Sequence, residues 1–169
     1  MARLIVFVSV IGAGLLAAPV LADDKPTSDN DFLIKAVSCS VGEAKLSDLA
    51  AKQASNEKVR EFAARIVKDH KSLTEGLLEQ AKGLKLGIVT GLEKDQKAKY
   101  DTLAKLKGAD FDRQYMDDVV DALEKLNSGF AFESKDGKLD TLRDFAKKNE
   151  TQVKKDLEEA KKIRDDLKK

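Results

Sequence analysis

The sequence has very few of the residues from which catalytic, metal and disulfide sites are usually built. Its 169 residues include one cysteine, Cys39, and one histidine, His70. A single cysteine excludes an internal disulfide framework, and a single histidine excludes any site that needs two histidines from one chain. The chain also has no tryptophan, two prolines and 5% aromatic residues. This composition fits poorly with a β-sandwich and well with long helices.

Neither sign of charge predominates. The 31 basic residues are balanced by 30 acidic residues, which argues against a nucleic-acid-binding protein held by bulk electrostatics. Charged residues make up 36% of the chain and hydrophobic residues 42%. The length and these proportions are typical of one folded domain.

The N-terminal segment has the pattern of a secretory signal peptide. A positive start at Arg3 precedes an uncharged stretch from Leu4 to Leu21, and small residues end the segment before Asp23. We expect export of the chain with cleavage after Ala22. The alternative is an uncleaved N-terminal membrane anchor, because the apolar span approaches the ~20 residues that cross a bilayer. Removing residues 1–22 discards only one charged residue and leaves equal numbers of basic and acidic residues.

The remainder predicts an all-α domain. After the signal peptide at 1–22 we expect a polar lead-in at 23–30 and a helical bundle domain at 31–169, since no stretch alternates with period two for long enough to form a strand. Glycines at 83, 87 and 91 mark an open connection in the middle of the chain. The helices are expected at about 31–54, 57–82, 93–107, 110–134 and 139–169.

Two long helix pairs joined by a long connection favour a four-helix bundle with one crossover that carries the short extra helix. A faint internal repeat supports this topology: residues 59–63 (VREFA) match residues 142–146 (LRDFA). Superposing Phe32 on Phe111 places Glu43 opposite Ala122. We therefore expect a duplicated helical hairpin in a ferritin-like arrangement.

Helical spacing places three ionisable side chains in otherwise apolar stripes. Glu43, His70 and Asp156 each lie in the middle of such a stripe. A carboxylate or imidazole in a bundle core is costly unless it is paired, hydrogen-bonded or ligating a metal. The stripes are Phe32, Ala36, Cys39, Glu43, Leu46 and Ala50; Phe62, Ile66, His70, Leu73 and Leu77; Phe111, Tyr115, Val119, Ala122 and Leu126; Asn149, Val153, Asp156, Ala160, Ile163 and Leu167.

Two explanations of these buried polar residues are open. Carboxylate and imidazole ligands suit iron, manganese or zinc, so Glu43, His70 and Asp156 are candidate metal ligands. Alternatively, Glu43 and His70 form a buried pair, or the side chains surround a hydrated pocket, and this fixes the helix register without any ion. Cys39, four residues before Glu43, fits a small buried hydrophobe, with a third soft ligand or a redox thiol as the alternative.

Two segments resemble the signature segments of an exported bacterial family, domain of unknown function 4142, which is regarded as ferritin-like. They are FAARIVKDH at 62–70 and GADFDRQYM at 108–116, and the likeness extends over about 31–167. The resemblance implies a glutamate on the first helix and histidines on the other three long helices. Glu43 and His70 match that pattern. Ala122 and Asp156 stand in place of histidines, which implies a reduced or lost site.

We therefore expect no enzymatic activity and no cofactor. The expected function is that of an exported envelope protein, periplasmic by the resemblance, that acts as a binding or stress-related structural module. A metal-binding or redox bundle with Glu43, His70 and Asp156 as ligands is the alternative. A protein partner is possible, nucleic acid is not expected, and docking on a membrane surface is disfavoured by the balanced charge.

Overall fold

The computed structural model describes residues 25–168, and within that range it contains five α-helices and no strand. The prediction of an all-α fold is confirmed. The predicted signal peptide at 1–22 lies outside the described residues. Within 25–168, none of the helices combines the length and apolarity that a bilayer crossing requires. The helices are α1 (Asp29–Gln53), α2 (Glu57–Gly83), α3 (Lys94–Leu103), α4 (Gly108–Asp136) and α5 (Asp140–Asp166).

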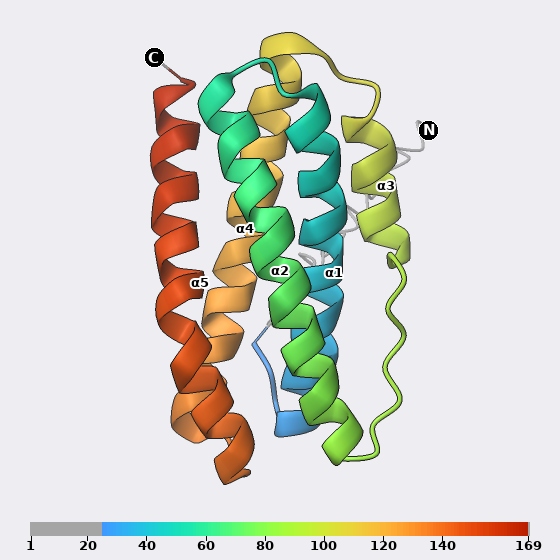
Figure 1. Cartoon of the computed structure of the whole chain (residues 1–169), viewed down its shortest axis with the longest axis vertical. Coiled ribbons are helices and arrows are strands. Elements are labelled where there is room, and N and C mark those ends of the chain that lie inside the picture. Colours follow the sequence, from blue (N-terminus) through green and yellow to red (C-terminus); the bar gives the residue numbers. More distant parts are fainter. Residues whose placement is uncertain (1–24, 169) are drawn as a thin grey trace, which may run out of the picture.

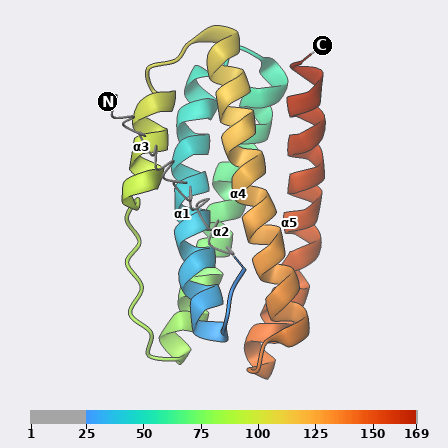
Figure 2. The same cartoon turned by 180° about the vertical axis from the view of Figure 1, so that it is seen from behind.

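The four long helices form two antiparallel hairpins that lie side by side (Figures 1 and 2). Helix α1 packs along α2, and α4 packs along α5; the hairpins meet mainly through α1 and α4. The segment between α2 and α4 runs the length of the bundle outside α1 and carries α3 (Figure 1). A short connection within each hairpin and a long crossover between them make this a four-helix bundle with one crossover.

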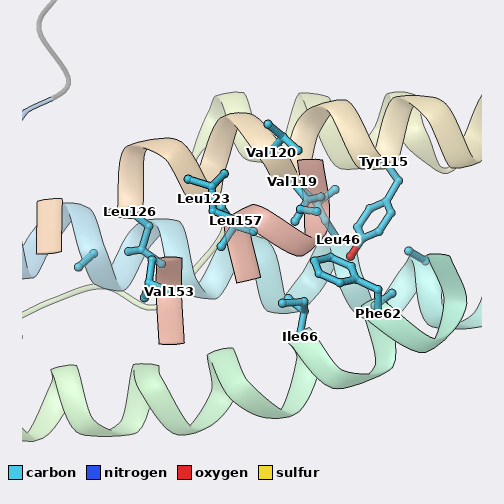
Figure 3. Packing of buried hydrophobic residues seen from close by; sticks show 14 of the residues in the cluster. Leu46, Phe62, Ile66, Tyr115, Val119, Val120, Leu123, Leu126, Val153 and Leu157 are labelled. Atoms are coloured by element: carbon cyan, nitrogen blue, oxygen red, sulfur yellow. The ribbon is translucent and has the colours of Figure 1, made fainter. Parts of the chain in front are cut away.

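The apolar stripes predicted from helical spacing face the shared core. Leu46, Phe62, Tyr115 and Val153 come from the four different long helices and converge between them (Figure 3). Each of these side chains is at most 3% exposed. Burial of such apolar surface is the main driving force for packing the hairpins together.

The N-terminus of α1 is capped by a serine side chain. The Ser28 hydroxyl caps α1 by accepting a hydrogen bond from the Asp31 amide (3.2 Å). The Asp31 carboxylate accepts from the Thr27 amide (2.9 Å), one residue earlier than a standard capping box would place it. Helix α1 therefore begins at Asp29, two residues before the expected position.

Each hairpin supplies an aspartate that caps the other hairpin. The Asp112 carboxylate, on α4, accepts hydrogen bonds from the amides of Ser55 (2.9 Å) and Asn56 (2.8 Å), between α1 and α2. The Asp29 carboxylate, on α1, accepts from the amides of Lys138 (3.0 Å) and Leu139 (2.8 Å), between α4 and α5. Both turns thus have their free amides satisfied by a carboxylate from the neighbouring hairpin.

These reciprocal contacts correct the register of the internal repeat. The two capping aspartates, their paired amides and the 59–63/142–146 match all share the sequence separation of Cys39 and Ala122, which is 83 residues. The superposition of Phe32 on Phe111 is wrong by one helical turn, because Phe111 and Tyr115 lie one turn apart on α4 and both face the core. The structural equivalents are Phe32 and Tyr115.

Helix α3 is held against α1 by a glutamine packed over a glycine. A Cβ at Gly42 would lie 2.7 Å from Gln96 Nε2, so a larger residue at position 42 would displace the Gln96 side chain from its present position. Gln96 Nε2 donates to the Ser38 carbonyl (2.8 Å), and the Ser38 hydroxyl donates to the Glu93 carboxylate (2.5 Å). These contacts place α3 beside the middle of α1, where Glu43 lies.

Candidate functional site

His70 lies on α2 and is only 2% exposed. Its Nδ1 lies 3.3 Å from the hydroxyl of Ser40 on α1, and that hydroxyl donates to the His70 carbonyl (3.1 Å). Because the Ser40 hydrogen points at the carbonyl, the Ser40 oxygen is available to accept a hydrogen bond from Nδ1. Burial lowers the pKa of His70 to about 4, so the imidazole is neutral near pH 7.

Asp156 lies on α5 and binds an arginine. Its carboxylate accepts from Arg65 Nη1 (2.5 Å), and Gln152 donates to the same oxygen (3.0 Å). Arg65 also reaches Glu159 (2.6 Å), so one guanidinium bridges α2 to two carboxylates of α5. Burial raises the pKa of Asp156, and the Arg65 hydrogen bond and charge oppose that rise.

Glu43 lies on α1 and has an orphaned oxygen. The side chain is 2% exposed, and its Oε2 has no hydrogen-bond partner within residues 25–168. Burial, followed by the nearby charge of Asp118, raises the pKa of Glu43 to about 8, and Lys99 opposes the shift. A buried polar atom without a partner carries a desolvation cost of about 1–3 kcal/mol.

The three candidate ligands therefore have separate surroundings. The expected Glu43–His70 pair is wrong in this structure: His70 binds Ser40, one turn before Glu43 on the same helix, while Glu43 has Lys99 and Asp118 as its charged neighbours. Helix α1 thus presents Ser40 to α2 and Glu43 toward α3 and α4. Among the described residues, no group of three or more histidine, cysteine or carboxylate side chains is close enough to hold a metal ion.

Ala122 and Cys39 face each other where the two hairpins meet. The Cys39 thiol donates a hydrogen bond to the Ala122 carbonyl (3.4 Å), and the thiol is not in a disulfide. These two residues are structural equivalents in the repeat, so they meet close to its symmetry axis. At this position the methyl group of Ala122 offers no ligating atom.

A cleft of about 420 Å³ opens between α1, α3 and α4. Glu43 and Cys39 form part of its wall, and the apolar part is made by Phe32, Ala36, Leu46, Ala122 and Leu126. Such a volume and a mostly apolar wall with one deep polar group are typical of small-molecule sites. The cleft contains neither His70 nor Asp156 among its lining residues.

Four buried carboxylates, and the arginine that pairs with Asp156, could not be recognised from helical spacing. Hydropathy alone gives no reason to bury these residues, because their environment depends on the partner helix. A search for aspartates at the true repeat spacing would have found the two capping residues. The missed residues are Asp29, Asp112, Asp118, Glu133 and Arg65.

The fold and its buried polar residues define the class: an all-α bundle of two related helical hairpins. The chain belongs to the family described as Domain of unknown function (DUF4142), whose model matches residues 16–163. The family resemblance drawn from the two signature segments is thereby confirmed. Neither the curated proteins nor the solved structures contain a match to this chain.

Proposed function

We propose that this protein is a non-catalytic helical bundle, exported to the cell envelope, that acts as a binding or stress-related structural module. The observation that carries this proposal is that two of the three buried candidate residues are hydrogen-bonded within the protein. His70 and Asp156, which a metal or acid–base function would use, bind Ser40 and Arg65 of the protein itself. A cleft with an orphaned carboxyl group remains for a ligand.

The alternative is a metal-binding or redox bundle of ferritin-like type, with Glu43, His70 and Asp156 as ligands for iron, manganese or zinc. It is supported by the burial of all three side chains and by the unpartnered Glu43 oxygen. As arranged, the residues do not fit a metal centre, because the Asp156 carboxylate is paired with Arg65 and the side chain of Ala122 supplies no ligand atom.

Elemental analysis by mass spectrometry separates the two functions. We would measure untagged protein, secreted natively and gel-filtered without chelator, beside His70→Ala. The proposal predicts sub-stoichiometric metal in both proteins and no uptake on titration with iron, manganese or zinc. Near-stoichiometric metal that is lost in His70→Ala would establish the alternative, and a hydrolytic or redox turnover lost in that variant would overturn the non-catalytic proposal.

Export is tested independently on the same preparation. Intact mass and N-terminal sequencing of the protein from the envelope fraction are expected to show a mature chain that starts at Asp23. A full-length chain in the membrane fraction would instead establish an N-terminal anchor.

A further inference from the structure

Glu43 is buried where the protein itself does not complete its hydrogen bonding. The residue equivalent to Glu43 in the second hairpin is Leu126, on the opposite wall of the cleft. An apolar side chain therefore suffices for the fold at this position. The Oε2 atom of Glu43 carries a desolvation cost that no hydrogen bond within residues 25–168 compensates, so this atom is available to a ligand that enters the cleft.

The charges around the cleft favour a cation as the occupant. Three lysines line the cleft and none of them is without a partner: Lys35 pairs with Asp31 (3.2 Å), Lys99 pairs with Asp118 (3.1 Å), and Lys125 also forms an interaction. Asp95 and Asp121 line the cleft and form no ion pair within the part of the chain that the structure describes. An anion would thus meet carboxylates at the entrance, whereas a cation would be attracted by those carboxylates and, once bound, would favour the ionised form of Glu43.

The apolar walls of the cleft favour a ligand that has an apolar body attached to its charged group. Phe32, Leu46 and Leu126 contribute apolar surface, and the volume of about 420 Å³ matches a molecule of modest size. We propose that the cleft between α1, α3 and α4 binds a small primary amine with an apolar body, whose ammonium group donates hydrogen bonds to Glu43. This inference rests on the proposed binding function and names its ligand class.

The test compares three probes that share a phenylethyl group and differ in their polar group, which is an amine, a hydroxyl or a carboxylate: 2-phenylethylamine, 2-phenylethanol and 3-phenylpropanoate. Binding to the full mature protein, shown beforehand to be metal-free, is measured by calorimetry and by protection of Cys39 from alkylation with iodoacetamide. The amine is expected to bind at least tenfold more tightly than the alcohol or the carboxylate, and to slow alkylation. Equal affinities, preference for the carboxylate or absence of binding would overturn the proposal.

Two variants locate the interaction. Glu43→Gln keeps the shape and is expected to weaken the amine at least tenfold while leaving the alcohol unchanged. Glu133→Gln is the matched control, because Glu133 is another buried carboxyl group with oxygens that have no hydrogen-bond partner among the described residues, and it lies outside the cleft. This variant is expected to bind the amine like the parent. Equal effects of both variants would overturn the proposal.

Ala122→Leu provides an independent variant with Glu43 intact. The larger side chain fills the cleft and is expected to abolish amine binding and protection of Cys39. Unchanged binding in Ala122→Leu would overturn the proposal even if Glu43→Gln failed to fold. Failure of these binding experiments on metal-free protein would leave the broader envelope-module function standing, whereas stoichiometric metal in the native protein would overturn that function separately.

Discussion

The two ends of the bundle carry the same cap and differ in the buried side chains beside it, most of all in one ionisable residue. Asp112 caps the turn between α1 and α2, and Asp29 caps the turn between α4 and α5. Beside Asp29 lies Glu133, which is fully buried and whose carboxyl oxygens have no hydrogen bond to any residue of the described range 25–168. The equivalent residue in the first hairpin is Ala50. The shared caps show what the hairpin needs in order to fold. The glutamate shows where one copy has an ionisable group that the other copy lacks.

The largest loss of stability is expected when a glutamate is placed at position 50, the equivalent of Glu133 in the first hairpin. Ala50→Glu would bury a carboxyl group in place of a methyl group, and we expect a loss of about 4 kcal/mol in the free energy of unfolding at pH 8. Ala50→Gln has the same bulk without the charge, so it measures the steric part. In denaturant titrations, the free energies of unfolding of the two variants should become equal below pH 4.5, where a glutamate is neutral. The same difference between them at every pH would contradict a charge effect.

Removing the caps is expected to have the next largest effect. Asp112→Ala leaves the amides of Ser55 and Asn56 without their acceptor and should cost about 3 kcal/mol. Asp29→Ala should cost less, about 2 kcal/mol, because the loss of the cap is partly offset. The substitution also removes a negative charge that repels the ionised form of Glu133. Thermal and denaturant unfolding measure both losses.

The matched control for the caps is Asp144→Ala. Asp144 is exposed, and its ion pair with Lys147 is long, at 4.0 Å. We expect a change within about 0.5 kcal/mol. A comparable loss in the control would show that the measured cost is not specific to capping.

The pH dependence of the free energy of unfolding should reveal the contribution of Glu133. Burial, followed by the charge of Asp29, raises its pKa to about 7 from an ordinary 4.5, with Arg143 opposing the shift. A raised pKa favours the neutral acid in the folded state, so its stabilisation is complete below pH 4.5 and is lost as the pH rises through 7. Glu133→Gln should remove about 2 kcal/mol of that pH-dependent loss, measured by urea titrations at pH 4.5, 6 and 8.

A companion variant distinguishes the two buried acids. Glu43→Gln should flatten the stability profile over a wider window, because burial raises the pKa of Glu43 to about 8. Identical windows for the two variants would contradict the assignment of separate environments.

The smallest expected effect concerns one pair of equivalent contacts. The hydroxyl of Tyr115 lies 2.9 Å from that of Ser47, and the equivalent residues Phe32 and Phe130 meet edge to face with ring centroids 5.1 Å apart. Tyr115→Phe leaves the Ser47 hydroxyl without this partner and should cost about 1 kcal/mol. In a double-mutant cycle with Ser47→Ala, the two losses should not add; full additivity would show that the bond contributes nothing.

The sequence was sufficient to predict the helices and the faces they bury. Glu43, His70 and Asp156 are all buried as their spacing indicates, because helical periodicity alone decides which positions share a face. Their partners could not be predicted in this way. His70 binds Ser40 and Asp156 binds Arg65, and these pairings depend on the rotation and offset of neighbouring helices, which a one-helix pattern does not contain.

What the sequence by itself determined is thus the family, the all-α class and the two helical hairpins, since these follow from local periodicity and from the two signature segments. Only the tertiary structure decided the register between the hairpins. One turn separates a pairing of Phe32 with Phe111 from the true equivalence with Tyr115, and both satisfy the apolar pattern. The reciprocal hydrogen bonds of Asp29 and Asp112 are directional and reach across the bundle, so they select one register where hydrophobic burial accepts either.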